Sequence, residues 1–98
     1  MGELADRYAL AFLEAGGDAS ELTRCARRLE EEPVLWAALV NPAVEPEEKV
    51  RVLSRLPEWA PADQVGRLFA LMARKERLSL LPEVAQASRR LALERRGG

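Results

Sequence analysis

The chain has 98 residues, with 15 Lys and Arg against 16 Asp and Glu, and a formal net charge of −1. This length predicts a single domain with one modest core that buries roughly 60–65% of the unfolded surface. Hydrophobic residues make up 48% of the chain and are mostly Leu and Ala, whereas isoleucine is absent and threonine occurs once. Because strands favour β-branched and aromatic residues and helices favour Ala, Leu, Arg and Glu, this composition argues against a β-sandwich or barrel.

The composition also excludes several kinds of chemistry. The chain has no histidine and a single cysteine, so a structural zinc site, a His-based dyad and an internal disulfide cannot be assembled. No carboxylate pair stands beside a nucleophile or a phosphate loop, so we expect no catalytic residue, cofactor site or metal site. The pI of about 5.6 argues against a nucleic-acid partner. No apolar run approaches the ~20 residues of a membrane span, so we expect no direct membrane insertion.

The first two predicted helices are separated by a glycine pair. The first helix covers about 3–15 and ends at Gly16 and Gly17, a common C-terminal signal. Asp18 then stands three residues before Glu21, which is the spacing of a capping box. A second helix is therefore predicted from there to about residue 31.

Four more helices are predicted further along the chain, which makes an all-α, compact six-helix bundle. The third is short, because Pro33 fits the first turn of a helix and Asn41 precedes a proline, where the α conformation is disfavoured. Trp36 and Trp59 each lie beside a chain break and are predicted to close the ends of the bundle. The predicted ranges are 34–40, 46–56, 61–75 and, after a turn at 76–79, a last helix that ends at the glycine pair 97–98.

The first and fifth helices carry more apolar residues than the single stripe of an ordinary surface helix. The rows predicted to face the core are Ala5, Ala9 and Phe12 on the first helix and Val65, Phe69 and Met72 on the fifth. The additional rows are Leu4, Tyr8, Ala11 and Ala15 on the first helix and Leu68 and Leu71 on the fifth, the latter flanked by Gln64 and Lys75.

Two interpretations of the additional rows remain open from the pattern alone. In one, both helices are central in the bundle and are covered on two sides. In the other, the rows line a groove that accepts an amphipathic helix from a partner. Small side chains at Ala11 and Ala15 would let such a helix approach closely. Periodicity identifies faces of a helix and does not say what covers them.

A family resemblance is carried by six segments that follow one another along the chain. They are RYALAF at 7–12, PVL at 33–35, LVNP at 39–42, EEK at 47–49, LMA at 71–73 and RLSLLPEV at 77–84. In order and spacing they resemble the N-terminal domain of the ATP synthase δ subunit, called OSCP in mitochondria. The resemblance implies a six-helix bundle over residues 1–98.

The resemblance implies a structural role and no enzymatic activity. Subunits of this family sit on top of the catalytic head of a proton-translocating ATP synthase and connect the head to the peripheral stalk. We therefore expect a stator component that lies in the cytoplasm, peripheral to the inner face of the bacterial plasma membrane.

The family also implies a partner and a binding site. In that family the N-terminal helix of an α subunit docks into a groove between the first and fifth helices, which are the two helices with additional apolar rows here. The candidate binding residues are Tyr8, Ala11 and Leu71 by motif position, and Leu4, Ala15, Leu68 and Lys75 by helical spacing.

The chain departs from the family pattern in two places. The family turn Glu-Asn-Gly-Arg-Leu reads Arg-Lys-Glu-Arg-Leu at 74–78, so Glu76 replaces the glycine. Either a left-handed residue there costs ~1 kcal/mol, or the turn is built differently. The family also continues into a C-terminal domain that binds the stalk's b subunits, whereas this chain ends at Gly98. We expect contact with b subunits only through that missing domain.

A different helical adaptor is the alternative outside the family. A death-fold-like interaction domain also packs six helices, but its pairing typically relies on charged patches. The additional apolar rows therefore favour a groove that binds a helix.

Overall fold

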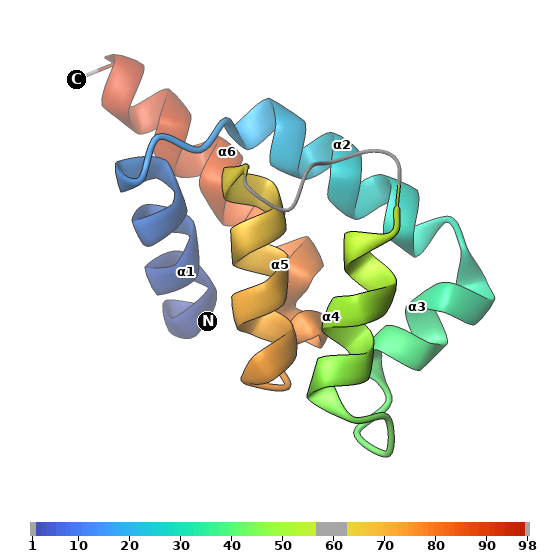
Figure 1. The fold of residues 1–98 in the computed structure, drawn as a ribbon. Coiled ribbons are helices and arrows are strands. Elements are labelled where there is room, and N and C mark those ends of the chain that lie inside the picture. The colour runs from blue at the N-terminus through green and yellow to red at the C-terminus, as the bar shows by residue number, and fades with distance from the viewer. Residues whose placement is uncertain (1, 57–62, 98) are drawn as a thin grey trace.

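The computed structural model describes residues 2–56 and 63–97. Within these residues the chain forms six α-helices and one short 3₁₀ helix, without a strand (Figure 1). The predicted all-α bundle of six helices is confirmed. The elements are α1 (Glu3–Glu14), α2 (Ala19–Glu30), α3 (Pro33–Val40), α4 (Pro46–Ser54), α5 (Gln64–Arg74), η1 (Leu78–Leu80) and α6 (Leu81–Gly97).

The packing of the helices leaves α1 and α5 loosely joined to each other. The most extensive contacts of α1 are with α6, which also packs on α2, and those of α5 are with α4. Figure 1 shows α1, α5 and α4 next to one another, with α1 and α5 running in opposite directions. α1 and α5 are thus neighbours that each pack mainly on another helix.

The core contains the rows that the sequence assigns to it. Ala9, Phe69 and Met72 are fully buried, and the other members of the two predicted core-facing rows are almost so. Complete burial of a side chain such as Phe or Leu contributes about 1.5–3 kcal/mol. The remaining helices supply further buried side chains to the same cluster, among them Leu22, Leu39, Leu53, Leu81 and Val84. Trp36 is half-buried against this cluster, whereas Trp59 lies outside the described residues.

The helix starts have identifiable caps. The Asp18 carboxylate accepts a hydrogen bond of 2.9 Å from the Ser20 N–H, which confirms the predicted start of α2. At the start of α5, Asp63 is extended and its carboxylate accepts a 2.9 Å hydrogen bond from the Gly66 N–H. The fifth helix therefore begins at Gln64, and the predicted start at 61 is wrong. The predicted chain break at 57–61 lies outside the described residues.

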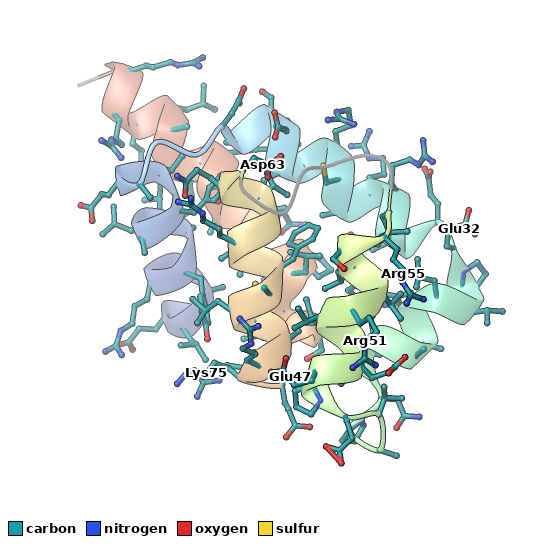
Figure 2. All side chains as sticks on the ribbon, in the orientation of Figure 1. Glu32, Glu47, Arg51, Arg55, Asp63 and Lys75 are labelled. Atoms are coloured by element: carbon teal, nitrogen blue, oxygen red, sulfur yellow. The ribbon has the colours of Figure 1, made fainter. Side chains whose placement is uncertain are left out.

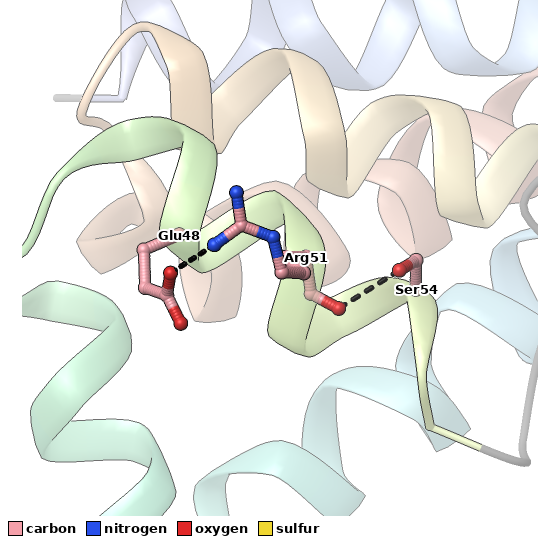
Figure 3. Close-up of polar contacts among 3 residues, drawn as sticks. All are labelled: Glu48, Arg51 and Ser54. Atoms are coloured by element: carbon pink, nitrogen blue, oxygen red, sulfur yellow. Dashed lines mark hydrogen bonds and ion pairs between the residues drawn. The ribbon is translucent and has the colours of Figure 1, made fainter.

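The exposed face of α4 is stabilised by local polar contacts (Figure 3). Glu48 and Arg51 form an ion pair one turn apart, and the Ser54 hydroxyl donates to the Arg51 carbonyl at 2.8 Å. Exposed pairs of this kind contribute about 0–1 kcal/mol. The next residue after Glu48, Lys49, points away from this face and is only 3% exposed.

Candidate docking groove

A groove of about 150 Å³ lies between α1 and α5. Because the two helices are antiparallel, the Tyr8 end of the α1 wall meets the Leu71 end of the α5 wall (Figure 1). Its lining residues are Tyr8, Ala11, Phe12 and Ala15 from α1 and Gln64, Arg67, Leu68 and Leu71 from α5.

The α1 wall is built from small side chains. Ala11 and Ala15 are both exposed, and their spacing of four places them on one face of the helix. Phe12 is buried behind them, where its ring belongs to the core. The alanines therefore leave room for another helix to approach the backbone of α1.

The α5 wall is built from larger side chains. Leu68 is 7% exposed and forms part of the floor, whereas Leu71 is 44% exposed. A leucine that is nearly half exposed beside a groove supplies apolar area that a partner can bury. The two walls together form a surface that is mostly apolar, with Arg67 and Gln64 on the α5 side.

The structure brings five of the seven candidate binding residues together at this groove: Tyr8, Ala11, Ala15, Leu68 and Leu71. Leu4 and Lys75 are not among the lining residues, because Leu4 lies one turn before Tyr8 and Lys75 one turn after Leu71. Leu4 is half-buried, and Figure 2 shows Lys75 at the end of α5. Binding of a partner at any of the seven remains a prediction.

A hydrogen bond joins α1 to the turn after α5 at the Tyr8 end of the groove. The Arg77 Nη1 donates to the Tyr8 hydroxyl at 3.1 Å, and so links α1 to the segment that follows α5. Tyr8 is also the lining residue closest to the start of α1. The bond therefore helps to hold the two walls at a fixed separation at this end.

Arg67 is a groove residue that the pattern of apolar rows does not predict. It lines the groove from α5, and no carboxylate is among the described residues that line it. Its spacing of three from Gln64 and four from Leu71 could have revealed it, because residues three and four apart share a helix face. The positive charge favours a partner helix with a carboxylate on that side.

The turn after α5 is left-handed at Glu76. Glu76 has φ 55°, and its N–H donates to the Ala73 carbonyl at 3.0 Å. The Arg77 N–H donates to the Met72 carbonyl at 2.8 Å, which completes a Schellman motif. Of the two alternatives for this turn, the structure therefore shows a glutamate in the position that favours glycine.

The described residues show no metal cluster and no membrane-spanning helix. No group of three or more His, Cys, Asp and Glu side chains in this part of the chain is placed to hold a metal ion. Among the helices described for the chain, none combines the length and the apolar character that crossing a membrane requires.

Comparison with known proteins places the chain in a family. Residues 4–98 match the family described as ATP synthase delta (OSCP) subunit. The chain belongs to this family. Three relatives named ATP synthase subunit delta are similar to it. The protein from Oleidesulfovibrio alaskensis is 39% identical over 82 residues, which cover 83% of this chain and 44% of the relative.

The two other relatives match at similar levels. The protein from Magnetococcus marinus is 31% identical, with 96% of this chain and 55% of the relative covered. The protein from Geobacter sp. is 32% identical, with 86% and 51% covered. The chain thus spans about half the length of the curated relatives it matches. No solved structure gives a significant match to the chain.

Proposed function

We propose that this delta-family chain is a non-catalytic stator component of an F-type ATP synthase, which holds the catalytic head by binding the N-terminal helix of an α subunit. The observation that supports this proposal is the open apolar groove between α1 and α5, which belongs to the two helices with additional apolar rows. In this proposal the chain lies at the cytoplasmic face of the membrane. The b subunits of the peripheral stalk contact a C-terminal domain that these residues do not include.

The shape of the groove fits one face of a helix. An amphipathic helix presents side chains at positions i, i+3, i+4 and i+7, and such a ridge can enter a groove between two antiparallel helices. The exposed alanines at 11 and 15 permit close approach along α1, and Leu71 supplies exposed apolar area on the α5 wall. Burial of a leucine-sized side chain contributes about 1.5–3 kcal/mol, so each apolar anchor of the partner helix that the groove covers strengthens binding.

The proposed role requires attachment without chemistry. A stator subunit resists the torque of the rotor, so its contact with the head must persist through each catalytic cycle. An interface formed by apolar burial meets this need and shows a negative heat-capacity change on binding. Association of the chain with the head should therefore depend on the groove and not on any reacting group.

Calorimetry with a synthetic peptide of the N-terminal residues of the α subunit from the same genome tests the proposal. We expect saturable binding with a negative heat-capacity change. Leu71→Asp should weaken it by tenfold or more, equivalent to ~1.4 kcal/mol, because a carboxylate would replace apolar contact in the groove. Leu10→Asp is the matched control, since Leu10 is 43% exposed against 44% for Leu71 but does not line the groove.

The two variants separate docking from folding. Both side chains are exposed, so we expect both variants to melt within a few degrees of the parent chain. If Leu71→Asp unfolds the domain, Leu71 belongs to the core and the groove is not a docking surface. Equal loss of peptide affinity in both variants, or no heat with the parent chain at micromolar concentration, would also contradict the proposal.

A further inference from the structure

The second candidate for a binding site in this molecule surrounds Lys49. Lysine is almost never fully buried without a partner, yet Lys49 is 3% exposed on the inner face of α4. Within the described residues its ammonium makes no ion pair or hydrogen bond. Among the described residues, Ser88 Oγ is the one side-chain nitrogen or oxygen atom that is fully enclosed and has no hydrogen-bond partner. Because the Lys49 ammonium also has no partner but is not such an atom, it must still reach solvent.

Lys49 lines a pocket between α3 and α4. Its volume of about 430 Å³ lies within the range of small-molecule sites, roughly 300–1,000 Å³. Apolar side chains form most of its wall, and Val34 at its edge is 85% exposed. The lining residues are Glu32, Val34, Leu35, Ala38, Leu39, Val44, Lys49 and Val52.

The charged residues that line the pocket favour an anion beside Lys49. Glu32 is the other charged lining residue, and it is exposed at the link between α2 and α3 (Figure 2). Its carboxylate forms no ion pair with Lys49 among the described contacts. Water and salt screen an exposed charge more than a buried one, so the field of the ammonium dominates inside the pocket.

We propose that this pocket binds a small monocarboxylate with a short aliphatic chain. The carboxylate would pair with the Lys49 ammonium, and the chain would lie along the valine and leucine side chains. A single ammonium matches a single negative charge, whereas phosphate sites usually converge several donors on one group. The pocket shares no lining residue with the groove between α1 and α5, so the inference stands apart from the α-subunit proposal.

Octanoate is the probe for this proposal, with 1-octanol as the uncharged control. In titrations of the 98-residue chain followed by ¹H–¹⁵N spectra, octanoate should shift resonances of α3 and α4 and bind at least about fivefold tighter than octanol. Such a ratio corresponds to ~1 kcal/mol, the scale of one partly desolvated ion pair. Lys49→Met should remove the preference for octanoate, whereas Lys75→Met, at an exposed lysine, should leave it unchanged.

Glu32→Gln gives a test that does not depend on altering the buried lysine. Removing the exposed carboxylate should strengthen octanoate binding about twofold and leave octanol binding unchanged. The proposal is overturned if octanol binds as tightly as octanoate, or if the octanoate shifts map to other helices. It is also overturned if sedimentation shows self-association that octanoate reverses, because the pocket would then be an interface between copies.

Discussion

The two walls of the groove between α1 and α5 are built on opposite principles. The α1 wall presents the exposed alanines at 11 and 15, which contribute little area but allow close approach. The α5 wall presents Leu68 as part of the floor and Leu71 as an exposed edge. One wall thus sets the distance at which a partner helix can lie, and the other supplies the apolar contact.

The two helices that form these walls end in the same backbone geometry, although the residue in the left-handed position differs. Gly16 after α1 has φ 93°, and Glu76 after α5 has φ 55°. Each end has the two hydrogen bonds of a Schellman motif, of which the outer ones run from Gly17 N–H to the Phe12 carbonyl and from Arg77 N–H to the Met72 carbonyl. The comparison shows that the same pair of local backbone hydrogen bonds closes a helix with either glycine or glutamate in the left-handed position, the glutamate at a cost in free energy.

A large side chain on the α1 wall should have the largest effect on affinity for the α-subunit peptide. Ala11→Trp would place an indole where a partner helix must approach, so affinity for the α-subunit peptide should fall by tenfold or more, ~1.4 kcal/mol. Ala37→Trp is the control, because Ala37 is exposed on α3 and lines neither the groove nor the Lys49 pocket. Calorimetry of both variants measures the difference. Unchanged affinity in Ala11→Trp would show that the partner does not enter the α1 wall.

Exchanging the residues at the helix ends should change stability by an intermediate amount. Glu76→Gly should raise the free energy of unfolding by about 1 kcal/mol, and Gly16→Ala should lower it by a similar amount. No atom lies within 4 Å of the site a Gly16 Cβ would occupy, so the second effect is conformational and not steric.

Thermal and urea unfolding measure both changes. For a domain of this size about 1 kcal/mol shifts the Tm by roughly 4–8 °C. Glu76→Ala separates backbone from charge, because it removes the carboxylate and keeps the left-handed strain. Stabilisation by Glu76→Ala equal to that of Glu76→Gly would attribute the gain to charge and contradict the conformational explanation.

Loss of the hydrogen bond between Arg77 and Tyr8 should have the smallest effect on stability and on peptide affinity. Tyr8→Phe removes the hydroxyl that accepts the hydrogen bond from Arg77 and keeps the ring that lines the groove. Because this bond is exposed, we expect a loss of about 0.5 kcal/mol in urea unfolding and less than a twofold change in peptide affinity. A tenfold loss of affinity would mean that the hydroxyl itself contacts the partner.

Helical periodicity was sufficient to predict most of the groove. The row of Tyr8, Ala11 and Ala15 follows from spacings of three and four, and the structure places all three at the groove. What periodicity could not supply was the length of the groove, because the end of a groove depends on tertiary contacts. For that reason Leu4 and Lys75 were predicted from spacing, although they lie beyond its lining residues.

Burial that depends on neighbouring helices was harder to predict than helix faces. Leu68 was assigned to an additional row, yet it is 7% exposed and belongs to both the core and the groove floor. Lys49 follows two glutamates and carries no apolar signal in the sequence, so its burial between α3 and α4 became visible only in the structure. The cap at Asp63 was missed because the prolines before it suggested an earlier helix start.

Mapping the α-subunit peptide onto the chain by ¹H–¹⁵N chemical shifts tests the central claim most directly. Docking in the groove predicts that the largest shifts upon saturation fall in α1 from Tyr8 to Ala15 and in α5 from Gln64 to Leu71. Amides of α3 and of the start of α4 should change little. Shifts centred on α3 and α4, or on the exposed C-terminal part of α6 around Leu93, would contradict the assignment of the groove as the docking site.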